Sequence, residues 1–145
     1  MDFRAYVVLA EALVSGGTEA EWRTAISRAY YGAFHVGCDL LTTLGFAVPR
    51  NDRAHAAVFL RLSNTADDAV IEAGRSLSTL RTLRNRADYE KRQRISATDA
   101  DNAVDAVHKI IETLDDSLSE PIRSQITDAI KKYERDVLKE ATWRA

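Results

Sequence analysis

The sequence predicts an all-α protein, an up-and-down bundle of four to five antiparallel helices followed by a C-terminal helix. Every segment longer than ten residues repeats its apolar side chains with helical period, and none alternates clearly enough to be a strand. The 145 residues include only two prolines and six glycines, so few positions interrupt a helix. The stretches between the helical segments are short, which favours antiparallel packing of neighbouring helices.

The first two helices meet at a pair of glycines. An apolar stripe predicts a helix over residues 3–14, and the glycines of the following turn end it. Thr18 and Glu21 have the spacing of a capping box, in which side chains satisfy the free amides of the first turn. They begin a long second helix that we expect to continue to residue 44, where Gly45 ends it.

A loop that contains Pro49 leads into the third helix. Either Asn51 or Asp52 can cap this helix, and its apolar residues extend over 54–62. A polar connection follows, and a fourth helix is predicted over residues 69–92.

The last third of the chain predicts two more helices. Thr98 and Asp101 have capping spacing at the start of the fifth helix, which ends at a Glu-Pro dipeptide because proline cannot continue an interior turn. A sixth helix is predicted over residues 122–143. We therefore divide the chain into a helical bundle, residues 1–120, and a C-terminal extension, residues 121–145, which packs on the bundle or on a second subunit.

Composition and charge exclude several functional classes. The net charge of −2 excludes a polycation that coats nucleic acid. One cysteine, Cys38, allows no internal disulfide, and the three histidines lack metal-ligand spacing, so we expect no metal and no other cofactor. No stretch approaches the roughly 20 apolar residues of a membrane span, and acidic Asp2 and Glu11 argue against a signal peptide. We expect a cytoplasmic protein without a membrane partner.

The stretch SRAYYGAFH (residues 27–35) divides the second helix into two faces. At 100° per residue, Arg28, Tyr31 and His35 share one side of the helix. This polar-aromatic face is either a second packing surface, against another helix or a second subunit, or a site for a phosphate and a base. In the second case Arg28 supplies charge and Tyr31 supplies a stacking surface. The core stripe on the opposite side consists of Ile26, Tyr30, Ala33, Phe34, Gly37, Leu40, Leu41 and Leu44.

The fourth helix carries the basic part of an otherwise acidic chain. Residues 75–94 contain seven basic and two acidic side chains, a local balance of +5. Arg81, Arg84 and Asp88 lie on one helical face, where Asp88 can pair with Arg84 one turn back. These arginines form either an ordinary solvated face or an electrostatic footprint for RNA or a nucleotide, since arginine suits bidentate phosphate contact.

Three stretches together resemble the HEPN family (higher eukaryotes and prokaryotes nucleotide-binding domain): SRAYYGAFH, RAHAAVF around His55, and LRNRADYE at residues 83–90. The chain is most similar to the small stand-alone prokaryotic members, over residues 1–118. The resemblance implies an all-α bundle, usually a homodimer, often encoded beside a minimal nucleotidyltransferase as a toxin–antitoxin-like pair. It also implies metal-independent endoribonuclease activity in many members.

The nuclease motif of that family is incomplete in this chain. Arg84 and Asn85 match its opening, but the expected histidine is absent, and Tyr89 at that spacing is a poor base because the ordinary pKa of tyrosine is about 10. His35 or His55 can replace it only if folding brings one of them near Arg84. We assign nucleotide or RNA binding to the arginine-rich and aromatic positions of both helices: Arg28, Tyr31, His35, Arg81, Arg84, Asp88 and Tyr89.

These observations leave three hypotheses. The leading one is a HEPN module that dimerises and binds a nucleotide, RNA or a nucleotidyltransferase partner without efficient catalysis. The second is a metal-independent endoribonuclease that uses Arg84 and Asn85. The third is a structural assembly protein, in which Tyr31 and Arg84 affect only the oligomeric state. No glycine-rich phosphate loop, dinucleotide fingerprint or zinc-protease motif supports another chemistry.

Overall fold

Six α-helices and one π-helical turn make up the regular structure, which contains no strand. The structure is a computed structural model and describes all 145 residues. It confirms the all-α fold class predicted from the sequence. In chain order the elements are α1 (Ala5–Val14), α2 (Glu19–Leu44), α3 (Arg53–Ser63), α4 (Asp68–Tyr89), α5 (Ala97–Asp116), α6 (Ile122–Tyr133) and the π-helical turn η1 (Glu134–Leu138).

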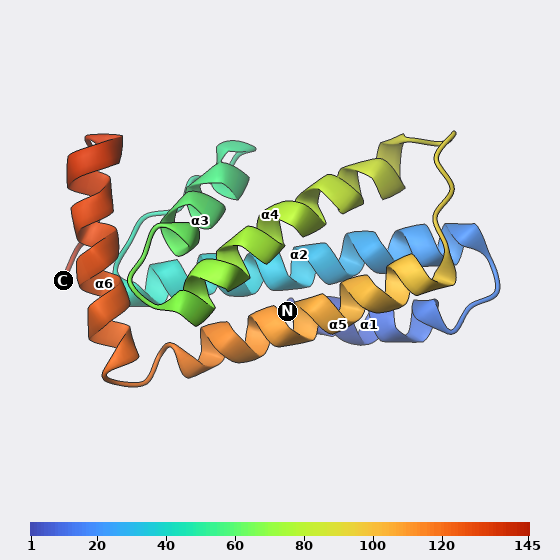
Figure 1. The fold of residues 1–145 in the computed structure, drawn as a ribbon, viewed down its shortest axis with the longest axis horizontal. Coiled ribbons are helices and arrows are strands. Elements are labelled where there is room, and N and C mark those ends of the chain that lie inside the picture. Colours follow the sequence, from blue (N-terminus) through green and yellow to red (C-terminus); the bar gives the residue numbers. More distant parts are fainter.

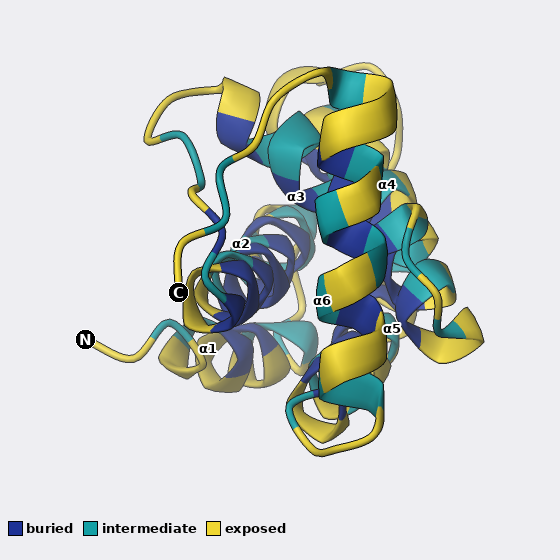
Figure 2. Ribbon diagram, turned by 90° about the vertical axis from the view of Figure 1, so that its left-hand side faces the viewer, coloured by how far each residue is buried: buried dark blue, intermediate teal, exposed yellow.

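The long helix α2 is the centre of the bundle, because it contacts α1, α3, α4 and α5. Helix α5 runs alongside α2, and α4 crosses α2 at an angle (Figure 1). Buried positions lie on the faces that these helices turn toward one another, and exposed positions face outward (Figure 2). The predicted core stripe of α2 is buried throughout, as expected for the helix that the others surround.

The boundaries of α2 agree with the prediction. The Thr18 hydroxyl accepts a hydrogen bond from the Glu21 amide at 3.3 Å, and Gly45 follows the helix in the left-handed region with φ of 106°. At the start of α3, Asn51 and not Asp52 supplies the side-chain oxygen, which accepts from the Arg53 amide at 3.0 Å.

Helix α4 ends at Tyr89, three residues before the predicted end. The Arg23 guanidinium, from α2, donates hydrogen bonds to the carbonyl oxygens of Arg86 and Ala87 at 3.2 and 2.9 Å. It thus supplies donors for carbonyl oxygens that lack a partner within the last turn of α4. The predicted cap of α5 was also wrong. Ser96 and Asp99 form the capping box there, with bonds of 3.0 and 2.9 Å, because burial of Ile95 brings the chain back to the bundle just before them.

The predicted sixth helix is too long, because α6 ends at Tyr133 and residues 139–145 are not helical. The Glu134 carboxylate is buried and accepts hydrogen bonds from Arg61 at 2.8 Å and from the Thr142 amide at 2.9 Å. A continuous helix would carry residue 142 two turns away from Glu134, whereas this bond requires the chain to turn back. The buried ion pair therefore outweighs the helical pattern of the sequence.

The last residues lie against the α2–α3 connection. The Trp143 indole donates to the Leu44 carbonyl at 2.8 Å, and the Arg144 amide donates to the Gly45 carbonyl at 2.8 Å. The C-terminal segment thus contacts the bundle within the same chain. None of the helices combines the length and the apolar character that crossing a membrane requires.

Candidate functional site

The contact between α2 and α4 brings the two predicted functional stretches together. Arg84 of α4 is 6% exposed, and its guanidinium carbon lies 5.0 Å from the Tyr31 ring centre and 5.5 Å from the Tyr30 ring centre. Both distances are within the range of cation–π attraction. The interpretation of these arginines as a solvated face is therefore wrong for Arg84, because the crossing of α4 over α2 covers it.

Asp88 links the buried arginine to α2. Its carboxylate lies 3.6 Å from an Arg84 terminal nitrogen and accepts a hydrogen bond from the Ser27 hydroxyl at 3.2 Å. The Arg28 guanidinium in turn donates to the Ser27 oxygen at 3.3 Å. The intrahelical pair predicted between Arg84 and Asp88 is present, but it belongs to a chain of polar contacts across two helices.

The polar-aromatic face of α2 also packs against the N-terminal part of the chain. The Arg28 guanidinium carbon lies 4.8 Å from the Tyr6 ring centre, and the His35 ring stacks on Phe3 with ring centres 3.7 Å apart. The same arginine lies 5.3 Å from Tyr31. Part of this face is therefore a packing surface against α1 and its preceding turn. Tyr31 contacts both Arg28 of this face and Arg84 of α4.

His55 of α3 belongs to the cluster, although the site prediction omitted it. Its Nδ1 lies 2.6 Å from the Tyr30 hydroxyl, and its ring stacks on Phe34 at 4.3 Å between centres. Burial lowers the pKa of His55, and the charges of Arg81 and Arg84 lower it further. Tyr30, expected only in the core, thus joins Arg84 to a histidine from another helix.

A hollow of about 480 Å³ opens beside this cluster, between α2 and the start of α3. Tyr31, His35 and His55 line it together with the α2–α3 connection. Burial lowers the pKa of His35, against a smaller upward effect of Asp39. Two imidazoles that are mainly uncharged at neutral pH therefore border the same hollow.

Three arginines of α4 have buried Nε atoms without a hydrogen-bond partner: Arg81, Arg84 and Arg86. A buried donor without a partner costs free energy, so it requires an explanation such as an ordered water or a bound group. Arg84 combines this free donor with nearly complete burial, and Arg81 lies one helical turn away on the same face.

Asn85 and Tyr89 do not join the cluster. Both border a shallow depression on another face of α4, and Tyr89 is 74% exposed. At 100° per residue they lie more than a quarter turn from Arg84, so the helix directs them away from α2. The structure therefore brings together Arg28, Tyr31, His35, Arg81, Arg84 and Asp88, adds Tyr30 and His55, and leaves Asn85 and Tyr89 outside.

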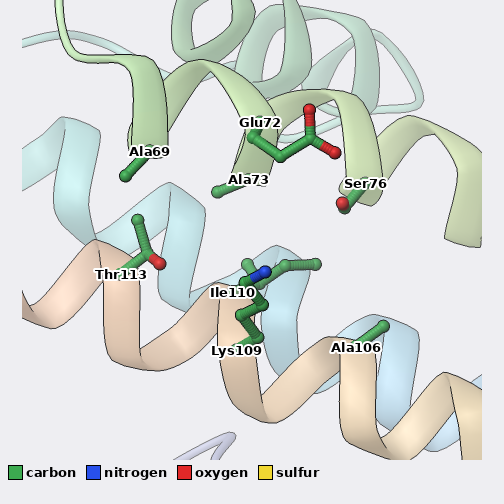
Figure 3. Close-up of a pocket in the computed structure, with 8 residues that line it drawn as sticks. All are labelled: Ala69, Glu72, Ala73, Ser76, Ala106, Lys109, Ile110 and Thr113. Carbon is green, nitrogen blue, oxygen red and sulfur yellow. The ribbon is translucent and has the colours of Figure 1, made fainter.

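A second hollow of about 250 Å³ lies between α4 and α5 (Figure 3). Small side chains line most of it, and Glu72 and Lys109 are its charged residues. No predicted functional residue borders this groove. The chain has no group of three or more histidine, cysteine, aspartate or glutamate side chains placed to hold a metal ion.

Comparisons of the chain with models of protein families, with curated proteins and with solved structures find no match. The functional interpretation therefore depends on the geometry of the cluster around Arg84 and on the chemistry of its residues. Sequence periodicity could not reveal His55, because the signal that connects it to α2 is a contact between helices. Its position in the RAHAAVF stretch and its possible role as a replacement for the missing motif histidine were the indications that the sequence offered.

Proposed function

We propose that this protein binds single-stranded RNA or a nucleotide at the cluster around Arg84. The observation that carries the proposal is a nearly buried arginine, in contact with two tyrosine rings, whose Nε has no partner. Arginine is the side chain best suited to bidentate phosphate contact, and tyrosine provides a surface on which a base can stack. The negative net charge makes a local site more plausible than a nonspecific coating surface.

The resemblance to HEPN proteins extends this proposal. The resemblance implies an all-α bundle, and this chain folds as one, with Arg84 on α4 next to the SRAYYGAFH stretch on α2. We therefore also propose membership of that family, a homodimer as the functional unit and a minimal nucleotidyltransferase as the protein partner. Size measurement in solution and co-purification with the product of an adjacent gene test these two assemblies.

A titration of the protein with a fluorescent single-stranded RNA and with nucleotides tests the binding proposal. Arg84→Ala should weaken binding by about 10-fold or more, the range expected for a charge-assisted phosphate contact. Arg84→Lys keeps the charge but not the bidentate geometry, so it controls for disruption of the fold. Arg75→Ala, an exposed arginine of the same helix, is the matched control and should bind as the wild type does. Absence of binding by the wild-type protein would overturn the proposal.

A second candidate function is metal-independent cleavage of RNA. The observation that favours it is that α2 and α3 bring His35 and His55 to one hollow beside Tyr31, which contacts Arg84. Cleavage requires a group that takes the proton of the ribose 2′-hydroxyl and one that protonates the leaving oxygen, and histidine suits both tasks. Wild-type protein should then cut RNA in EDTA, and Arg84→Ala, His35→Ala and His55→Ala should each abolish the cutting. Intact RNA after incubation with the wild type would exclude this candidate.

A further inference from the structure

The hollow beside Tyr31 has a side that the predicted site does not include. The α2–α3 connection contributes Arg50, Asn51 and Asp52 to its lining, in addition to the aromatic residues of α2. Tyr31 and Phe34 form apolar walls, and the connection forms a polar edge. A planar ring with a hydrogen-bonding edge is the kind of ligand that such a hollow fits.

His55 presents a defined donor at this edge. The Tyr30 hydroxyl is buried, burial raises its pKa, and the protonated hydroxyl lies 2.6 Å from Nδ1 of His55. We assign the hydroxyl as the donor of this hydrogen bond and Nδ1 as its acceptor. The neutral imidazole then carries its hydrogen on Nε2. Because Nδ1 is used within the protein, Nε2–H is the hydrogen-bonding group that the ring can offer to a ligand in the hollow.

The two neighbouring side chains of the connection complement this donor. The Asn51 side-chain oxygen accepts from the Arg53 amide at 3.0 Å, which leaves its amide hydrogens free to donate. Asp52 lies at the cap position of α3, but its carboxylate accepts no hydrogen bond from the first turn. The edge of the hollow therefore offers two free carboxylate oxygens as acceptors and the nitrogens of His55 and Asn51 as donors.

We propose that this hollow binds a guanine base, with Asp52 accepting hydrogen bonds from N1–H and the N2 amino group and with His55 donating to a ring acceptor. The inference rests on the proposed function, since it states which base the RNA or nucleotide presents there. Of the four RNA bases, only guanine carries two adjacent N–H groups that match the two oxygens of a carboxylate. Its O6 and N7 are the acceptors that nitrogen donors recognise in proteins.

Calorimetric titration with guanosine, adenosine and xanthosine monophosphates tests this assignment. Wild-type protein should bind the guanosine nucleotide about 10-fold or more tightly than the adenosine nucleotide, as expected for a bidentate contact. Xanthine has a carbonyl where guanine has the N2 amino group. A side chain that recognises xanthine at this edge therefore needs one acceptor and one donor, as an asparagine amide has, whereas guanine needs the two acceptors of a carboxylate. Asp52→Asn should therefore lose the guanosine preference and favour the xanthosine nucleotide, a gain that an unfolded variant cannot show.

The control is Asp105→Asn, the same change at an exposed position of α5, which should retain the wild-type preference. Equal affinity for guanosine and adenosine nucleotides, or an Asp52→Asn variant with unchanged preference, overturns the inference. In either case binding that still depends on Arg84 leaves the proposed function intact. Loss of the proposed function would instead appear as failure of the wild type to bind every nucleotide and the RNA probe.

Discussion

The Arg84 guanidinium lies 5.0 Å from the centre of the Tyr31 ring, across the contact between α4 and α2. One residue comes from the basic stretch and the other from the polar-aromatic face, and the sequence separates them by more than 50 positions. The contact joins both predicted features into one cluster, and Tyr31 of this cluster also lines the hollow between α2 and the start of α3.

Removal of the Tyr31 ring should weaken ligand binding while leaving the fold in place. Tyr31→Leu should reduce RNA affinity by about 10-fold, since stacking of a base on an aromatic ring contributes roughly 1–3 kcal/mol. Tyr31→Phe keeps the ring and should bind nearly as the wild type does. Tyr89→Leu, at an exposed tyrosine outside the cluster, is the control. Fluorescence anisotropy with a labelled RNA measures all three, and wild-type affinity in Tyr31→Leu would contradict the role of this ring.

The pair formed by Arg61 and Glu134 should be important for stability. Their side chains are 4% and 1% exposed. Glu134→Ala leaves the buried Arg61 with the half-exposed Glu140 as its remaining ion-pair partner, 2.7 Å away, and should cost about 1–3 kcal/mol of unfolding free energy. The double change Arg61→Met with Glu134→Leu removes both charges and should recover much of that loss. Urea unfolding followed by circular dichroism measures both, and a double variant less stable than the single one would be the opposite result.

Stability should fall as the pH is lowered below the ordinary histidine pKa of about 6.5. Burial lowers the pKa of both His35 and His55 in the folded protein, so the unfolded chain binds more protons in this window. The free energy of unfolding should therefore be smaller at pH 5.5 than at pH 7.5. His55→Asn, whose side-chain oxygen can still accept from Tyr30, should show a smaller difference between the two pH values. An unchanged difference in this variant would argue against His55 as a source of the effect.

Gly37 permits the close approach of α3 to α2. A Cβ at this position would lie 2.9 Å from Cγ1 of Val58, whose side chain is fully buried. Gly37→Ala should therefore destabilise the protein by about 1–3 kcal/mol through overpacking. Gly17→Ala meets no atom within 4 Å and is the control, expected within about 0.5 kcal/mol of the wild type. Thermal unfolding of the two variants should separate them clearly, and equal midpoints would contradict the close contact.

Two alanine substitutions test which residue caps the N-terminus of α5. Ser96→Ala removes the capping oxygen that accepts from the Asp99 amide and should cost about 1 kcal/mol. Thr98→Ala lies inside the first turn and should have little effect. A larger loss in Thr98→Ala than in Ser96→Ala would instead support the cap position predicted from the sequence.

Helical periodicity was sufficient for the fold class and for the core stripe of α2, because local spacing decides which side chains share a face. Periodicity predicted the wrong helix ends where a contact with a distant part of the chain decides where the helix stops. Arg23 satisfies the end of α4 from another helix, and Glu134 is held by Arg61 and Thr142. Neither partner can be identified from spacing along one helix.

Some features of the candidate site likewise follow from the sequence, and others follow only from the tertiary structure. The sequence by itself determined that Arg28, Tyr31 and His35 share a face and that Arg81, Arg84 and Asp88 share another, since both statements follow from one helical repeat. Only the tertiary structure decided that Arg84 is buried against the tyrosines, that His55 bonds to Tyr30, and that Asn85 and Tyr89 lie elsewhere. The physical reason is that burial and hydrogen bonding depend on how α4 and α3 cross α2, and those crossings arise from packing of the whole core.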